Sequence, residues 1–323
     1  GQRLLRRIGV HLAGRDLVEV RNYPFIGVSD IDALGLDASD SRRHAMTLAN
    51  PLSDELPLMR TTLLPSVFGA LARNISRGFA DSALFEIASV VAPSKDQPST
   101  GVTNPPRPSV SARPSQKDLD AIEKLIPAQP LHCAVVSGQH VWSDAIEIVL
   151  TLASELGVQL VVNSAAVAPW HAGRCAQFVL DGTVIGHAGE LTPRVIEAFS
   201  LPKRTVALEI NLDAVLTRAN TVPSAPQIWT FPVAKEDIAL VVGDAVAAQD
   251  VLNVVREAAG DLLEDIKLFD VYQGAQVAQG HKSLAFALRF RAQDRTLSAE
   301  EVAAARLAGI AAAEKAFGAT LRG

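Results

Sequence analysis

Hydrophobic and polar positions alternate along this chain with two different periods. Large apolar residues at positions 4, 5, 8 and 12 share one helical face that ends before Gly14, and residues 17–20 that follow have strand character. Further helical faces lie at 65–78 and 144–157, a strand is expected at 83–90, and packed structure is expected to resume at Leu131. Residues 206–212 alternate every second position, as in a half-buried strand. The first two thirds of the chain are therefore predicted to form a mixed α/β unit.

Local signals fix some of these boundaries. Pro65 suits the first turn of a helix and Gly78 its end. Asp144 with Glu147 predicts a capping box at the start of another helix. The triplets Phe178-Val179-Leu180 and Thr183-Val184-Ile185 flank an Asp-Gly pair, which predicts a β-hairpin.

The last segment, residues 231–322, predicts the order strand, helix, strand, strand, helix, short strand. The strands are expected at 238–242, 262–269 and 283–290, and the helices at 246–258 and from Ser298 to Gly318. A βαββαβ order is typical of a split βαβ sandwich, the ferredoxin-like fold. Phe269-Asp270-Val271-Tyr272 would place a ring and a carboxylate where a strand ends and a turn begins. We expect this module to bind a ligand and not to catalyse a reaction.

Two stretches of different composition divide the chain. Residues 92–117 are rich in Pro, Ser, Thr, Gln and Gly and predict a disordered surface insertion, about 93–118. A second Pro-rich stretch begins at Val222 and marks the main boundary. We therefore expect a core at 1–222, a linker at 223–230 and a final domain at 231–323.

Composition narrows the classes of function. The 323 residues are 48% hydrophobic and 20% charged, as in a packed soluble protein of two or three domains. The longest apolar stretches, such as 146–153, are too short to span a bilayer, and the first residues lack a signal-peptide pattern, so we expect a cytoplasmic protein. The net charge of −5 argues against a general basic surface for nucleic acid, so any RNA contact should be local. The chain starts without a methionine and resembles the carboxy-terminal part of something longer.

Cysteine and histidine provide no metal-binding pattern. Cys133 and Cys175 lie far apart without CxxC spacing, and buried roles are expected for both. The seven histidines form neither an HExxH motif nor a cluster with cysteine. We predict no metal site in these residues.

Motifs throughout the chain resemble the β-subunit family of bacterial phenylalanyl-tRNA synthetases, in its carboxy-terminal half. In the core the resemblance rests on Asn50-Pro51-Leu52-Ser53, Met59-Arg60-Thr61-Thr62-Leu63-Leu64-Pro65, Leu71-Ala72-Arg73-Asn74, Leu84-Phe85-Glu86-Ile87, Trp170-His171-Ala172-Gly173-Arg174 and Gly186-His187-Ala188-Gly189-Glu190. In the last segment it rests on Phe231-Pro232, Asp237-Ile238-Ala239, Phe269-Asp270-Val271-Tyr272-Gln273-Gly274, Gly280-His281-Lys282-Ser283-Leu284, Arg295-Thr296-Leu297 and Leu321-Arg322.

The resemblance implies an α+β fold with a catalytically silent, class II synthetase-like core, built on a mixed and mostly antiparallel sheet, before a ferredoxin-like anticodon-binding domain. It implies an (αβ)₂ ligase that joins phenylalanine to its tRNA with ATP and magnesium, both used at the α subunit and not bound by this chain. The expected partners are the α subunit, tRNA(Phe) and the rest of the β subunit, with no DNA and no membrane. The family's editing and magnesium-binding modules are expected to precede Gly1.

The residues themselves agree with a silent core. Class II aminoacylation needs arginines on its second and third motifs to hold ATP phosphates. The predicted strand 83–90 has no arginine, and no GxGxxR-like segment is found. Arg60 and Arg174 could be buried structural ion pairs or contacts with α. Ala172 replaces the family's usual proline, which leaves the turn there open.

Several residues of the last segment are candidates for tRNA binding. Asp270 and Tyr272 lie two apart on an extended segment and so share a face, which lets a ring stack on a base while a carboxylate accepts from guanine. The resemblance implies that these two meet the first anticodon base, that Ser283 assists and that Arg322 approaches the middle base. Lys235 is a weaker candidate for a phosphate contact, as are Arg289 and Arg291. For an arbitrary FDxY sequence, a half-buried strand aromatic and a turn-forming aspartate would be the simpler interpretation.

Two other classes of function remain open. The core could itself be an ATP-dependent ligase, which charging of tRNA by this chain alone would support. The last segment could be a regulatory small-molecule domain or a structural module without RNA contact, because ferredoxin-like folds host many functions.

Overall fold

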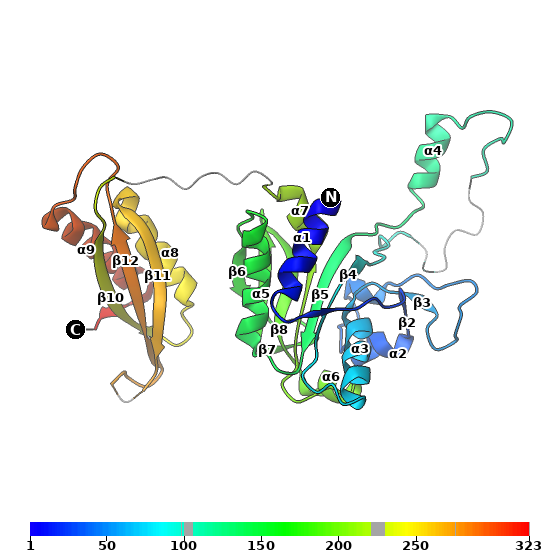
Figure 1. Cartoon of the computed structure of the whole chain (residues 1–323), viewed down its shortest axis with the longest axis horizontal. Coiled ribbons are helices and arrows are strands. Elements are labelled where there is room, and N and C mark those ends of the chain that lie inside the picture. The colour runs from blue at the N-terminus through cyan, green and yellow to red at the C-terminus, as the bar shows by residue number, and fades with distance from the viewer. Residues whose placement is uncertain (98, 100–105, 221–229, 275, 323) are drawn as a thin grey trace. The chain divides into compact units, whose positions relative to one another are not determined.

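The computed structural model describes residues 1–97, 99, 106–220, 230–274 and 276–322. These residues form two compact units, Gly1–Pro223 and Ser224–Gly323, shown in Figure 1. The linker predicted at 223–230 lies outside the described residues except for Thr230. Each unit is described separately below.

The first unit is built on a seven-stranded sheet with strand order β1-β4-β5-β9-β8-β7-β6. Only β1 and β4 run parallel, and every other described pair in this sheet is antiparallel. This confirms the expected mixed, mostly antiparallel sheet. The strands are β1 (Val18–Glu19), β4 (Ala83–Ser89), β5 (Leu131–Ser137), β6 (Val161–Ser164), β7 (Trp170–Leu180), β8 (Thr183–Leu191) and β9 (Val206–Asn211), and a separate ribbon pairs β2 (Phe25–Ile26) with β3 (Leu58–Met59).

Helices cover both faces of this sheet, so the unit has two apolar cores. One core lies under α1 (Gln2–Ala13), α5 (Trp142–Glu155) and α7 (Leu212–Arg218). The other lies under α2 (Val28–Ala33), α3 (Leu64–Ser76) and α6 (Pro193–Ala198). A short 3₁₀ turn, η1 (Ser41–Arg43), precedes β3. Two-sided coverage explains why strands such as β5 and β9 are buried almost throughout.

The start of α5 corrects the predicted capping box. The helix begins at Trp142 with Val141 as its N-cap, three residues before Asp144, the N-cap that the sequence predicted. Asp144 instead lies in the first turn, where its carboxylate accepts a hydrogen bond of 2.9 Å from the Val141 N–H. A carboxylate in this place still satisfies an orphan donor and complements the helix dipole, so the chemistry was correct and the position wrong.

The hairpin predicted at Asp181-Gly182 is confirmed. Strands β7 and β8 meet there, and both turn residues have positive φ, 49° for Asp181 and 78° for Gly182. Aspartate and glycine tolerate this left-handed backbone, which matches the twist of the flanking strands.

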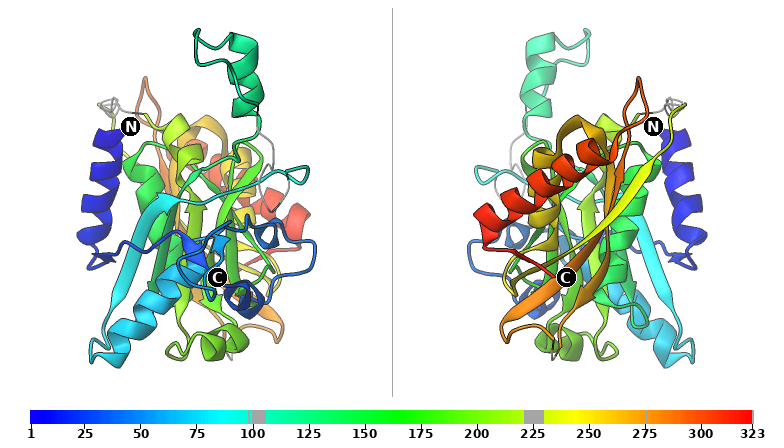
Figure 2. Two further views of the ribbon diagram at one scale, coloured as in Figure 1. Left: turned by 90° about the vertical axis from the view of Figure 1, so that its right-hand side faces the viewer. Right: turned by 90° about the vertical axis from the view of Figure 1, so that its left-hand side faces the viewer.

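An arm containing α4 (Gln116–Glu123) projects from the first unit, as Figure 2 shows. An isolated bridge between Ala92 and Ala128 closes its base. The helix has a Ser115–Asp118 capping box and no buried residue, and it begins within the stretch expected to be disordered. The helix was not predicted because this segment has few large apolar residues. Its capping box and local hydrogen bonds support it instead. Residues 98 and 100–105 of the predicted insertion lie outside the described residues.

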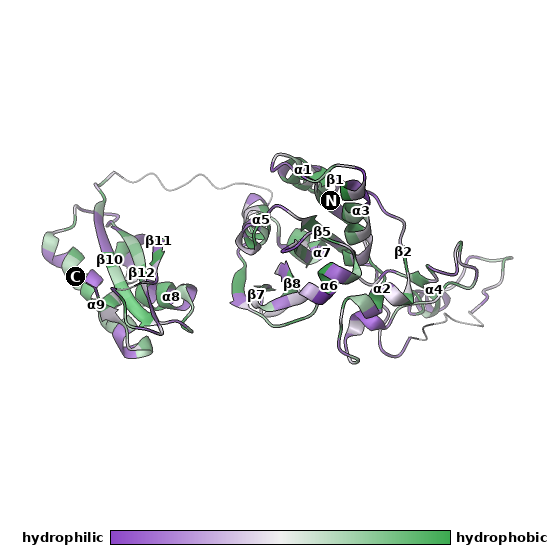
Figure 3. Ribbon diagram, turned by 90° about the horizontal axis from the view of Figure 1, so that it is seen from below, coloured by the Kyte–Doolittle hydropathy of each residue, from purple (hydrophilic) through white to green (hydrophobic). Residues whose placement is uncertain are grey.

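The second unit has the predicted βαββαβ order. Its sheet order, β11-β12-β10-β13, places the first and third strands at the centre, as in ferredoxin-like folds. The elements are β10 (Ala234–Gly243), α8 (Ala248–Ala259), η2 (Gly260–Leu262), β11 (Leu263–Tyr272), β12 (His281–Phe290), α9 (Ala299–Phe317) and β13 (Thr320–Leu321). Figure 3 shows the predominantly hydrophobic central strands β10 and β12.

Both helices of this unit pack on one face of the sheet. Leu284, Phe286, Leu288 and Phe290 of β12 alternate toward that face and are almost fully buried. Helix α9 lies across the strands in the right-hand view of Figure 2. It starts with the predicted Ser298–Glu301 capping box and ends at Gly318, whose φ of 63° favours glycine. Within the described part of the chain, no helix is long and apolar enough to cross a bilayer.

Candidate nucleic-acid interface

The face of the four-stranded sheet opposite α8 and α9 carries most of the residues singled out for RNA binding. Alternation along β12 turns Ser283 and Ala285 away from the buried face. Antiparallel register sets Tyr272 opposite Ser283, and Asp270 opposite Ala285. We call this side the open face.

Strand β11 runs further than the sequence suggested. It was expected to end at Phe269, before a turn, but it continues to Tyr272 with a bulge between Leu268 and Asp270. The extra residue of a bulge shifts the alternation, so that the side chains after it exchange the two faces of the sheet. The predicted sharing of a face by Asp270 and Tyr272 is confirmed by their register opposite Ala285 and Ser283.

Arg322 reaches the same end of the open face from the opposite edge of the sheet. Its N–H donates to the Ala239 carbonyl at 2.8 Å, which extends the pairing of β13 with β10 by one residue. Its guanidinium lies over the Tyr272 ring, 5.0 Å from the ring centroid. Asp270, Tyr272, Ser283 and Arg322 therefore form one cluster, which we call the Tyr272 cluster.

Ser283 is the most enclosed member of the Tyr272 cluster, with 3% of its surface exposed although it lies on the open face. Asp270 is exposed, and Tyr272 and Arg322 are partly buried. The cluster thus offers a carboxylate acceptor, an aromatic ring and a guanidinium at a solvent-facing surface. Stacking plus acceptance from an exposed base edge is what such a set can do for an unpaired nucleotide.

Lys235 lies apart from the Tyr272 cluster. It pairs in register with Arg289, whereas Ser283 lies six residues further along the same strand, about 20 Å away. Near Lys235, Arg289 lies 3.8 Å and Arg291 3.3 Å from the Glu264 carboxylate. Lys235 is therefore remote from the Tyr272 cluster.

Arg60 lies inside the first unit in a buried ion pair. Its Nη1 is 3.0 Å from Glu86 Oε1, and the two side chains are 5% and 1% exposed. Its Nε donates to the Ser89 carbonyl at 3.2 Å, and Asn22 Nδ2 donates to Glu86 Oε2 at 2.8 Å. With these partners Arg60 ties β3 to β4, and it has almost no surface to offer another chain.

Arg174 lies nearer the surface, in an ion pair with Glu190 that Arg204 joins from 3.4 Å. The arginine side chain is 36% exposed and the glutamate 8%. Burial raises the pKa of Glu190, but the hydrogen bonds and charges of Arg174 and Arg204 together outweigh it, so the pKa lies below its usual value. Arg174 can therefore support β8 and still meet a partner.

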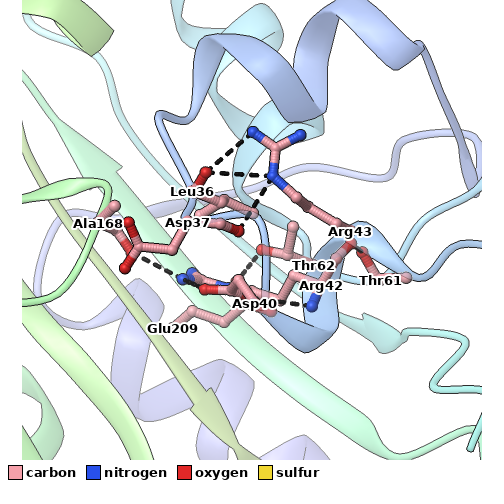
Figure 4. Close-up of polar contacts among 9 residues, drawn as sticks. All are labelled: Leu36, Asp37, Asp40, Arg42, Arg43, Thr61, Thr62, Ala168 and Glu209. Carbon is pink, nitrogen blue, oxygen red and sulfur yellow. Dashed lines mark hydrogen bonds and ion pairs between the residues drawn. The ribbon is translucent and has the colours of Figure 1, made fainter. Parts of the chain in front are cut away.

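A cavity of about 480 Å³ opens above strands β5, β8 and β9 of the first unit. Figure 4 shows the polar residues beside it: the Arg42 guanidinium is held by the Asp40 carboxylate at 3.0 and 2.7 Å and by the Ala168 carbonyl at 2.8 Å. Burial raises the pKa of Asp40, but the hydrogen bonds from Arg42 and the charges of Arg42 and Arg43 together outweigh it, so the pKa is lowered. Arg42 is the only arginine among the described residues that line the cavity, and its guanidinium is already paired with a carboxylate.

Glu209, on the floor of the cavity, is also satisfied from within. It accepts hydrogen bonds from His132 Nδ1 at 2.7 Å, from the Leu63 N–H at 3.1 Å and from the Thr62 hydroxyl. Burial raises the pKa of Glu209, but the His132 hydrogen bond and its other partners outweigh it, so the pKa is lowered. Asp40, Arg42 and Glu209 were not predicted as site residues from the sequence. For Glu209 the reason is that the alternating run 206–212 predicts a solvent-facing side chain at its position.

A neutral histidine borders the cavity. The His187 ring stacks near Trp170 with centroids 5.4 Å apart. Burial, and then the Arg42 charge, lower the pKa of His187 to about 4. Burial likewise raises the pKa of Cys133 to about 12 and of Cys175 to about 11, so both thiols stay protonated. Among the described residues, no group of three or more His, Cys, Asp or Glu side chains is placed to hold a metal ion.

Two family models match the chain. Residues 1–212 match the phenylalanyl tRNA synthetase beta chain CLM domain, and residues 230–322 match the ferredoxin-fold anticodon binding domain. The second match ends at Arg322, so it includes the whole Tyr272 cluster.

Relatives agree with both models. The chain is 49% identical to a phenylalanine–tRNA ligase beta subunit of Thermobifida fusca, covering 100% of this chain and 40% of the relative. It is 48% identical to that of Streptomyces avermitilis, covering 99% and 40%. The chain thus spans about two fifths of the length of these relatives. A solved pyrrolysyl tRNA synthetase from Desulfitobacterium hafniense is 12% identical, covers 67% of this chain and 66% of its own, and has a TM-score of 0.46, too low to support an argument.

Proposed function

The chain belongs to the family of phenylalanine–tRNA ligase β subunits, and from this premise we propose that it is a non-catalytic part of that ligase which binds the tRNA anticodon. The observation that carries the proposal is the Tyr272 cluster, a ring, a carboxylate and a guanidinium gathered on the open face. An unpaired base needs a surface on which to stack and a partner for its exposed edge.

We assign one role to each member of the cluster. Tyr272 stacks on the first anticodon base, and Asp270 accepts hydrogen bonds from the N1 and N2 donors of a guanine there. Ser283 supports the ring from the neighbouring strand, and Arg322 approaches the middle base. Lys235 meets a phosphate further along the RNA.

In the whole protein the first unit acts as a silent relative of the class II catalytic core and as a scaffold for the catalytic α subunit. Arg174 is the better placed of the two arginines to meet α, because Arg60 is buried. Two α and two β subunits would form the cytoplasmic enzyme that uses ATP and magnesium. The cavity beside Arg42 does not fit a nucleoside triphosphate. The Arg42 guanidinium is already paired with the Asp40 carboxylate, and the Glu209 carboxylate on the cavity floor would repel phosphates.

Binding of the 323-residue chain to a fluorescent hairpin RNA with the phenylalanine anticodon loop tests this function. Tyr272→Ala should weaken binding by about 1 to 3 kcal/mol, the usual value of stacking one base on a ring. The matched control is Tyr23→Ala, which removes the other tyrosine of the chain, 78% exposed in the first unit, and should leave affinity unchanged. Equal affinity of wild type and Tyr272→Ala would favour a structural or regulatory module without RNA contact.

A further inference from the structure

One face of the Tyr272 ring is already occupied. The Arg322 side chain starts from the edge position beside β10 and reaches over β10 and β12 to the ring on β11. Its guanidinium carbon lies 5.0 Å from the ring centroid, within the range of a cation–π contact. Ser283, on the strand between them, is 3% exposed. The same face of the ring cannot hold the guanidinium and a base together.

The residues after β11 hold both partners of this contact. A side chain at Gly274 would meet the Tyr272 hydroxyl at 2.5 Å and the ring carbon that bears it at 2.8 Å. The end of the tyrosine ring therefore lies beside the backbone of Gly274, and a side chain at this position would displace it. Gln276, two residues later, accepts a hydrogen bond from Arg322 Nη2. Gly274 leaves room for the Tyr272 ring, and Gln276 holds the Arg322 guanidinium over it.

We propose that Arg322 is a displaceable cap on Tyr272, held by Gln276, and that the incoming base takes its place on the ring that Gly274 positions. The inference rests on the proposed function and deepens it. An exposed cation–π contact is weaker than stacking of a base on a tyrosine, so the exchange is favourable. Displacement also frees a guanidinium beside the RNA, where it can bind a phosphate or a base edge. Gly274, Gln276 and Arg322 are positioning residues in this account.

Hydroxyl-radical footprinting read by mass spectrometry tests the cap in the absence of RNA. The chain has two tyrosines, so the oxidation rate of Tyr272 can be expressed relative to that of exposed Tyr23 in the same sample. Arg322→Ala should raise this ratio about two- to fivefold, as expected from losing an exposed cation–π contact. Gln276→Ala should raise it by a smaller factor, because the cation remains but its tether is lost. An unchanged ratio in Arg322→Ala would overturn the cap.

A matched control removes a different arginine of the same unit. Arg295, paired with Glu301 at the start of α9, can be replaced by alanine without touching the cluster, and the ratio should not change. An equal rise in Arg295→Ala would also overturn the cap, since it would report loosening of the whole unit. Adding the anticodon hairpin to the wild type should protect Tyr272. Absence of protection would contradict the proposed function, and the RNA-free ratio in Arg322→Ala would still decide the cap.

Discussion

Some charged side chains in the first unit form buried ion pairs, and removing one partner of such a pair leaves the other charge buried without a counter-charge. Arg60→Ala would leave Glu86 buried and without its cation, so we expect a loss of about 3 to 5 kcal/mol in the free energy of unfolding. Arg204→Ala is the control, because its side chain is 67% exposed and surface pairs contribute about 1 kcal/mol or less. Urea unfolding followed by tryptophan fluorescence measures both. Similar small losses in the two variants would refute a structural role of Arg60.

The cavity histidine makes stability depend on pH. The folded pKa of His187, about 4, lies below the unfolded value of 6.5, so the unfolded state binds more protons between these values. Stability from this group is complete above pH 6.5 and is lost as pH falls toward 4. Wild type should therefore unfold at lower urea at pH 5 than at pH 7, and His187→Gln should show a smaller difference. An identical pH dependence in both proteins would contradict a buried neutral His187.

Helix caps act at the scale of whole elements. Ser298 accepts the Glu301 N–H at the start of α9, which packs into the core of the second unit, so Ser298→Ala should destabilise that unit by about 1 kcal/mol. Ser115 caps α4 in the same way, but α4 buries no residue. Ser115→Ala should leave global unfolding unchanged. Hydrogen exchange of the two helices distinguishes these outcomes, and equal effects would show that α4 is part of a core.

Elements with local signals were the ones that the sequence could predict. The Asp181-Gly182 turn, the α9 cap and the βαββαβ order depend on neighbours along the chain, and the structure agrees with them. The end of β11 was misplaced because pairing with β12, and not the exposed Phe269-to-Tyr272 pattern, decides where the strand stops. Helix α4 was missed because composition outweighed its cap.

Contacts between distant parts of the molecule were beyond the sequence. The bond from Arg42 to the Ala168 carbonyl, the Glu209 network and the tether of Arg322 by Gln276 join residues that only the fold brings together. The candidate set on the open face followed from the resemblance and from two-residue spacing. Which of its members meet was decided by register, and Lys235 was left apart.

For the whole molecule, a net charge of −5 means that the RNA binding we propose has to come from a local site. The most direct test is a cycle that combines Asp270→Ala with replacement of guanine by adenine at the first anticodon position of the hairpin, measured with the whole chain. Adenine lacks the N2 donor, so each single change should cost about 1 to 3 kcal/mol and the two together little more than one. Full additivity of the two losses, or no loss from Asp270→Ala, would contradict reading of the anticodon by the open face.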